Sequence, residues 1–216
     1  MTGAAQSHDN SLAASVREWS LAALLVLALL LGGGGSPSPV SELALQLTSA
    51  AVLFAALFTG AFGEKEPGRT AWALAGLALF VPLLHLVPLP PALWQALAGR
   101  DQIVAGLSLV GDADVWRPLS IAPEKTLASV LALLPALGIL LLAASSPHDR
   151  VRRALWIVAA VAIAGAVLGT VQMASAGQSG YVYGETHRGW VTGFFANRNA
   201  AADHFLIAMI ITGVLA

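Results

Sequence analysis

Cysteine is absent from the 216-residue chain, and charged residues make up only 11% of it. Without cysteine the chain has no disulfide framework and no thiolate metal site. A soluble domain carries roughly 25% charged residues to cover its surface. The shortage of charge, together with 57% hydrophobic residues in long runs, excludes a soluble enzyme, a nucleic-acid binder and a disordered tail. A multi-pass membrane protein remains, and the net charge of −1 indicates no particular partner.

A membrane-spanning helix needs roughly 20 mostly apolar residues. Lipid offers the backbone no hydrogen-bond partners, so the spans must be helices, which form these hydrogen bonds within themselves. The sequence therefore predicts an all-α fold, a transmembrane bundle of about six helices over 19–216, after a cytoplasmic tail at 1–18. The expected spans are 19–35, 40–63, 71–87, 126–145, 154–174 and 199–216. The first of these also resembles the hydrophobic region of a signal peptide, but no A-x-A cleavage site follows it, which favours a retained helix.

Basic residues in short loops predict the orientation, because cytoplasmic loops carry an excess of lysine and arginine. The loops 64–70 and 147–153 hold five of them, which places both loops and the N-terminus in the cytoplasm. The longer loops 89–125 and 175–198 then lie outside. Within the first, residues 92–110 carry apolar side chains at near-helical spacing and a tryptophan, which predicts an interfacial helix after the third span.

Polar groups in or beside a membrane are costly and are therefore candidates for function, and most of the candidates of interest fall between Tyr181 and His204. Arg188 and Arg198 could bind a phosphate or diphosphate head group bidentately, or they could simply extend to lipid head groups. Asn199 could cap the sixth helix, whose N-terminal dipole also attracts anions. A G-x-x-x-G spacing in the fifth span has two interpretations, close packing within the chain or dimerisation.

The segment 193–206 reads GFFANRNAAADHFL and resembles the G-x-F-x-N-x-N-x-x-A motif of the O-antigen ligase family of bacterial membrane proteins. Arg188 and, more loosely, the run 118–126 are similar to that family's pattern. The resemblance implies a glycan ligase or polymerase in the cell inner membrane. Such enzymes move a glycan from undecaprenyl diphosphate to an acceptor glycan, lipid or protein at the outer face, without metal or other cofactor.

The resemblance also implies roles for residues. Arg188 and Arg198 would contact the lipid diphosphate, while Gly193, Asn197 and Asn199 would shape the motif. The remaining candidates follow with the roles expected of them: His187 and His204 as weak candidates for the base, His85 as a packed or interface histidine, Glu42 and Asp203 near helix N-termini, and Trp190 in the aromatic belt or stacked on a sugar.

Family members are longer, with further spans and a large external loop that carries the candidate base. We therefore expect this chain to correspond to their N-terminal portion, either as a fragment or with the C-terminal half supplied by another chain. The alternative from another class is a non-catalytic multi-pass protein such as a transporter subunit. A transporter is expected to carry charges or broken helices near the bilayer midplane, whereas the charges here fall at the ends of the predicted spans.

Overall fold

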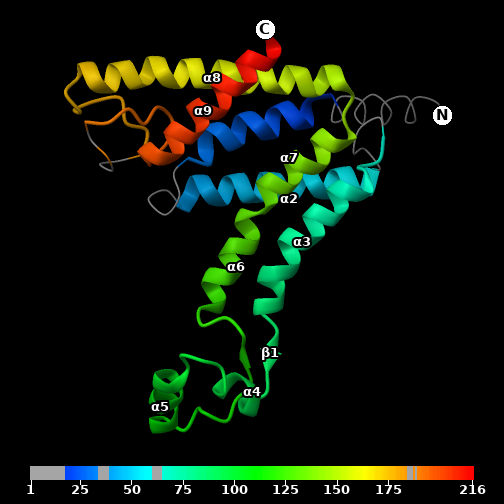
Figure 1. Cartoon of the computed structure of the whole chain (residues 1–216), viewed down its shortest axis with the longest axis vertical. Coiled ribbons are helices and arrows are strands. Elements are labelled where there is room, and N and C mark those ends of the chain that lie inside the picture. Colours follow the sequence, from blue (N-terminus) through cyan, green and yellow to red (C-terminus); the bar gives the residue numbers. More distant parts are fainter. Residues whose placement is uncertain (1–17, 34–38, 60–64, 184–186, 188) are drawn as a thin grey trace, which may run out of the picture. The chain divides into compact units, whose positions relative to one another are not determined.

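A computed structural model describes residues 18–33, 39–59, 65–183, 187 and 189–216 of the chain. The described part is mostly helical, with 72% of its residues in helices, as the sequence predicts (Figure 1). The chain divides into two compact units, residues 1–72 with 134–216 and residues 73–133. Residues 1–17, 34–38 and 60–64 lie outside the described residues, so the expected tail, the expected connection between the first two spans and the end of the expected second span are not described in full.

The first unit is built from long apolar helices. They are a helix at Glu18–Leu31, α2 (Pro39–Thr59), α7 (Leu134–Ser145), α8 (His148–Ala174) and α9 (Arg198–Leu215). In this unit α8 packs against α9, and α2 packs against α7 (Figure 1). A cluster of buried side chains joins four of these helices: Leu21, Leu24, Leu45, Leu142 and Ala154.

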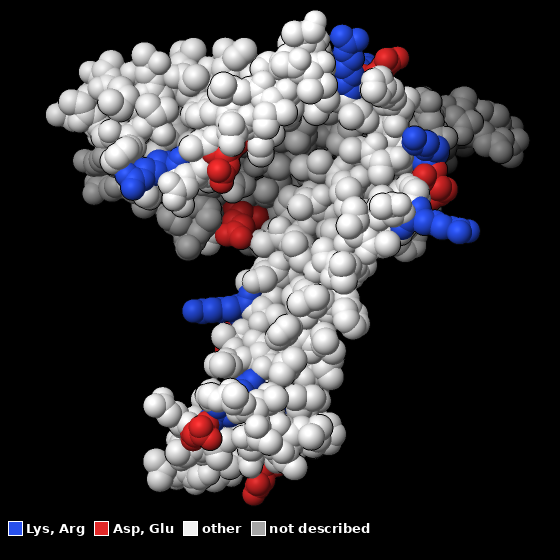
Figure 2. Space-filling model, in the orientation of Figure 1, with Lys and Arg blue, Asp and Glu red and all other residues white. Residues whose placement is uncertain are grey.

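Three helical stretches are long and apolar enough to cross a membrane, namely Pro39–Phe58, Pro123–Ser145 and His148–Ala174. On the face seen in Figure 2, charged side chains are sparse and most of the surface is uncharged. The helices Glu18–Leu31 and α3 (Arg69–His85) are apolar but shorter. The helix α9 is not among the three, because its first two turns hold Arg198, Asp203 and His204.

Two of the expected spans differ from the helices of the structure in ways that the sequence explains. The helix α8 begins at His148, so the arginines expected in a loop at 147–153 lie in its first turns. Pro147 precedes it with an extended backbone and Asp149 lies in its first turn, both favourable at a helix start. The stretch 123–145 is interrupted at Leu133, two residues before Pro135, which lacks the N–H for a helical hydrogen bond.

The second unit contains the last part of α3, α4 (Pro91–Gln95), α5 (Asp101–Leu109), α6 (Pro123–Ala132) and two short strands. The strands β1 (Pro88–Leu89) and β2 (Arg117–Pro118) pair antiparallel, with Leu89 opposite Arg117. The expectation of one helix over 92–110 is wrong, because the structure has two separate helices there, α4 and α5. Gly99, with φ of 79°, stands between them in the left-handed region that glycine adopts without strain.

Trp94 is the centre of this second unit. Its side chain is fully buried, and its Nε1–H donates to the Val115 carbonyl oxygen at 2.9 Å. The neighbouring Gln95 donates from Nε2 to the Ala113 carbonyl at 2.8 Å, and the buried Arg100 donates to the Leu119 carbonyl. These hydrogen bonds hold the segment between α3 and α6 in an ordered conformation that folds back on itself.

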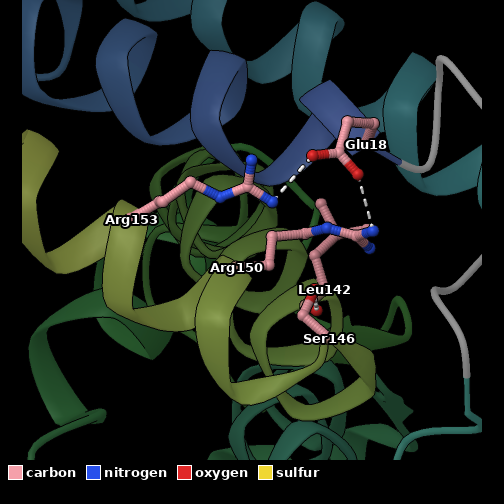
Figure 3. A network of polar contacts seen from close by, with 5 residues as sticks. All are labelled: Glu18, Leu142, Ser146, Arg150 and Arg153. Atoms are coloured by element: carbon pink, nitrogen blue, oxygen red, sulfur yellow. Dashed lines mark hydrogen bonds and ion pairs between the residues drawn. The ribbon is translucent and has the colours of Figure 1, made fainter.

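An ion-pair network joins the first helix of the first unit to α8 (Figure 3). Glu18 accepts from Arg150 at 2.9 Å and from Arg153 at 2.7 Å, one arginine on each carboxylate oxygen. Burial acts to raise the pKa of the Glu18 carboxyl, but the hydrogen bonds and charges of both arginines outweigh it and lower the pKa. The helix at Glu18–Leu31 is therefore held at its start by charge as well as by its apolar face.

Candidate functional site

The residues singled out by the motif lie in the segment between α8 and α9 and at the start of α9. Arg188, together with residues 184–186, lies outside the described residues, so the structure places only one arginine of the expected pair. Arg198 is the first residue of α9. The remaining motif residues are described, and they divide between the helix start, a pocket and the packing against α8.

The cap of α9 is Asn197 and not Asn199, which corrects the sequence expectation. Asn197 has an extended backbone, with φ of −118° and ψ of 125°, and its side-chain Oδ1 accepts from the Asn199 backbone N–H at 2.8 Å. This is the usual geometry of an asparagine N-cap. Asn199 instead contributes to the wall of the adjacent pocket.

That pocket has a volume of about 540 Å³ and is lined by α8, the loop and α9. The residues lining it are Met173, Gly189, Trp190, Val191, Arg198, Asn199 and Ala202. The Arg198 guanidinium carbon lies 4.0 Å from the centroid of the Trp190 ring. A guanidinium over an aromatic face is attracted to it, while its N–H groups along the edge remain available to an anion.

Arg198 makes no ion pair with any residue in the part of the chain that the structure describes. Its position at the first turn of α9 adds the partial positive charge of a helix N-terminus. The pocket therefore combines a fixed cation, an aromatic wall and an asparagine side chain. That combination suits an anionic group attached to a larger polar or apolar body.

Gln172, which the sequence analysis did not single out, holds the loop that forms the pocket. Its side chain is fully buried near the end of α8. The Gln172 Oε1 accepts from the backbone N–H groups of Thr192 at 2.9 Å and Gly193 at 3.1 Å. Its Nε2 donates to the carbonyls of Gly180 at 2.9 Å and Gly193 at 3.1 Å. One amide thus satisfies both ends of the loop, as a buried polar group requires.

The G-x-x-x-G face at Gly165 and Gly169 packs against the loop and against Phe205 of α9. A side chain at Gly169 would collide with Val191, which lies directly against it. Gly193 has φ of 55°, and a β-carbon on it would lie 3.0 Å from the Gly165 carbonyl oxygen. Packing within the chain, one of the two interpretations of this spacing, is what the structure shows. Gly193 is required here by both its backbone conformation and its close approach.

Two further hydrogen bonds attach the loop to the end of the first helix. The Tyr183 hydroxyl donates to the Leu30 carbonyl at 2.7 Å, and the Ala196 N–H donates to the Gly33 carbonyl at 2.8 Å. Burial raises the pKa of Tyr183, with a smaller opposing effect from a hydrogen bond to Ser41. The tyrosine therefore stays a neutral donor, which suits its carbonyl partner.

The two histidines proposed as bases have different surroundings. His187 is exposed, with φ of 61°, and its carbonyl accepts from the Trp190 N–H at 3.2 Å. His204 is 7% exposed and packs between Phe195 and Phe205, with ring centroids 5.2 and 6.0 Å away. Its Nε2 is buried without a hydrogen-bond partner, and His204 is not among the residues lining the pocket.

The other polar candidates lie elsewhere. His85 is exposed at the end of α3, with Nδ1 2.7 Å from the Val81 carbonyl oxygen. Glu42 lies in the first turn of α2, and Asp203 is exposed in the second turn of α9.

The run 118–126 lies in the second unit at the start of α6, where the Ser120 and Thr126 hydroxyls are 2.6 Å apart. Lys125 and His85 border a pocket of about 500 Å³ there.

No cluster of three or more histidine, aspartate or glutamate side chains suited to a metal ion occurs among the described residues. Comparisons with family models, with curated proteins and with solved structures gave no match to this chain.

Proposed function

We propose that this chain is a multi-pass inner-membrane protein of the O-antigen ligase type that binds a polyprenyl-diphosphate-linked glycan. The observation that carries the proposal is the pocket in which Arg198 lies over Trp190. The motif 193–206 supports it from the sequence. The reaction would be transfer of the glycan from undecaprenyl diphosphate to an acceptor glycan, lipid or protein in O-antigen or exopolysaccharide assembly.

The chemistry of that transfer explains why an arginine is suitable. Breaking a sugar–diphosphate bond develops negative charge on the leaving diphosphate, and fixed cations stabilise it. Arg198 is held by its stacking on Trp190 and by its place at the helix start, so little ordering is needed when the ligand arrives. Arg188, ten residues earlier in the sequence, is proposed as the second cation.

Two histidines are candidates for the base that would activate the acceptor hydroxyl. His187 is exposed and hydrogen-bonded through its carbonyl to Trp190, whereas His204 is packed between aromatic rings. Of these two, His187 has the better access to an acceptor.

The proposed topology places the N-terminus in the cytoplasm. The first turns of α8 contain Arg150, Arg152 and Arg153, and the short segment before α3 contains Lys65. This distribution of basic residues supports a cytoplasmic location for both, with the Arg198 pocket at the outer face.

The experiment measures binding of undecaprenyl diphosphate to the full chain in nanodiscs, for the unchanged protein and for Arg198→Ala, Arg198→Lys and Arg152→Ala. A hydrogen-bonded charged contact contributes about 1.5–3 kcal/mol, so Arg198→Ala should weaken binding by about 10- to 100-fold. Arg198→Lys should recover part of the loss because it keeps the charge but not the planar fork. Arg152, exposed in α8, is the matched control and should bind as the unchanged protein does.

The proposal fails if Arg198→Ala binds undecaprenyl diphosphate as tightly as the unchanged protein. Binding that depends on Arg198 without any glycan transfer by the chain would support a non-catalytic binding role. In that case the alternative of a non-catalytic membrane protein becomes the better account.

A further inference from the structure

A second hollow lies between the same two helices, farther along α9. It has a volume of about 300 Å³. Its walls are four residues of α8 and four of α9: Ala159, Ala162, Ile163, Ala166, Phe205, Ala208, Met209 and Thr212. The only polar side chain among them is Thr212, whose hydroxyl is bonded to the carbonyls of Ala208 at 3.0 Å and Met209 at 2.9 Å. The hollow therefore presents an apolar lining.

The two hollows share one stripe of α9. Residues 198 and 202 line the pocket at the helix start, and residues 205, 209 and 212 line the apolar hollow. Steps of four, three, four and three residues keep side chains on one face of a helix. From Arg198 to Thr212 is fourteen residues, or about 21 Å at roughly 1.5 Å per residue. The stripe thus begins at a cation and continues as an apolar surface.

The α8 residues that line the two hollows also lie along one face of their helix. Met173 lines the pocket beside Arg198, and Ala166, seven residues earlier, lines the apolar hollow. Seven residues are close to two helical turns, so both lie on one face. Three of the four α8 residues are alanines, whose small side chains leave a groove between α8 and α9.

We propose that this groove, lined by the eight residues named above, binds the hydrocarbon chain of a single-chain lipid whose phosphate or diphosphate contacts Arg198. The inference rests on the proposed function for the head group. The charge at one end and the apolar lining beyond it match an amphiphile with one anionic head and one chain. The volume of about 300 Å³ lies at the lower end of ligand pockets, so the hollow has room for the head-proximal part of one chain and not for two chains.

The test uses a polyprenyl diphosphate with a photoreactive diazirine in its chain, bound to the 216-residue chain in nanodiscs. After irradiation, mass spectrometry locates the cross-links. Cross-links should concentrate in residues 159–166 and 205–212. A prenyl alcohol carrying the same diazirine is the background probe, because any apolar helix surface contacts lipid. Labelling of the groove by the diphosphate probe should exceed that background at least ten-fold.

Two alanine substitutions provide a matched pair. Ala166 is exposed in the groove wall, and Ala166→Phe should fill the groove and reduce its labelling at least ten-fold. Ala164 is also exposed on α8 but is not among the groove residues, so Ala164→Phe should leave labelling unchanged. Because the changed side chain is exposed in both variants, folding should be preserved, and intact α8 can be checked by circular dichroism.

The outcomes separate the groove from the head-group site. If diphosphate binding depends on Arg198 but the chain cross-links elsewhere, the groove is overturned and the proposed function stands. If Arg198→Ala changes neither binding nor labelling, and the prenyl alcohol labels the groove equally, both proposals are overturned. Competition identifies the source of the phosphate. Unlabelled undecaprenyl diphosphate should remove the groove cross-links, whereas removal by phosphatidylglycerol alone would contradict a single-chain ligand.

Discussion

Replacement of Gln172 by leucine is expected to release the loop that carries Trp190 from the end of α8. Leucine is close to glutamine in size, so the change removes hydrogen bonds and leaves the packing volume almost intact. The backbone N–H groups of Thr192 and Gly193 lose their acceptor, and the carbonyls of Gly180 and Gly193 lose their donor. The loop can then satisfy these groups only by opening to water.

The magnitude follows from the buried N–H groups. Each buried donor left without a partner costs about 1–3 kcal/mol, so the two amides at Thr192 and Gly193 together cost at least about 2 kcal/mol. Since about 1.4 kcal/mol is a factor of ten, the opening equilibrium should shift by about 30-fold or more. The unpaired carbonyls add to this figure.

The assay is hydrogen exchange at the Thr192 and Gly193 amides in the full chain in nanodiscs. Gln172→Leu should raise their exchange rates by about 30-fold or more, provided that exchange follows loop opening. Gln178→Leu is the matched control, because Gln178 is an exposed glutamine of the same loop. Gln172→Glu keeps an acceptor for the two amides and should give a smaller increase. Unchanged exchange at both amides in Gln172→Leu would refute the reasoning.

Three other changes test separate parts of the structure. Gly169→Ala should lower the melting temperature, because the new methyl group would collide with Val191 and overpacking costs about 1–3 kcal/mol. Gly213 has open space around it, so the control Gly213→Ala should raise the free energy of unfolding by about 0.5–1 kcal/mol. The pKa of Glu18 in the folded state lies below its usual value, so its ion pairs stabilise the fold at pH values above that usual value. This stabilisation is lost as the pH falls through the lowered pKa. Melting temperatures measured between pH 3 and 6, a range of ~3 units around the ordinary carboxyl pKa, should show this loss in the unchanged protein and not in Glu18→Gln. Trp94→Phe removes the hydrogen-bond donor to the Val115 carbonyl and should lower the stability of the second unit by about 1–3 kcal/mol. Proteolysis of residues 88–122 should then be faster than in the unchanged protein. Equal cleavage rates would contradict the role given to this hydrogen bond.

The helical nature of the chain is predictable because long apolar runs with few charges can satisfy their backbone in lipid only as helices. Helix ends are less predictable, and α8 is an example. Its apolar run begins near Ala154, but Pro147 and Asp149 favour a start at the preceding turn, where the structure has it. In the segment 92–110, the apolar spacing suggested one helix, whereas Gly99 permits the chain to turn between two.

Within the candidate site, the sequence motif identified the segment but not how it is held. Arg198 and Asn199 line one pocket, and the capping role belongs to Asn197. Gln172 was missed, although a glutamine in the last turns of an apolar helix is itself a signal, since it needs buried partners. Those partners are backbone groups eight and twenty to twenty-one residues away, which no side-chain pattern reveals.

The docking of Val191 and Gly193 onto the glycine face of α8 has a consequence for self-association. A G-x-x-x-G face can draw a helix of a second copy close, but here its two glycines already have occupants from the same chain. A second copy could reach them only by displacing the loop, and with it the tryptophan over which Arg198 lies. Dimerisation through this face and an intact pocket therefore exclude each other, so copies that associate with the pocket formed must meet through another surface.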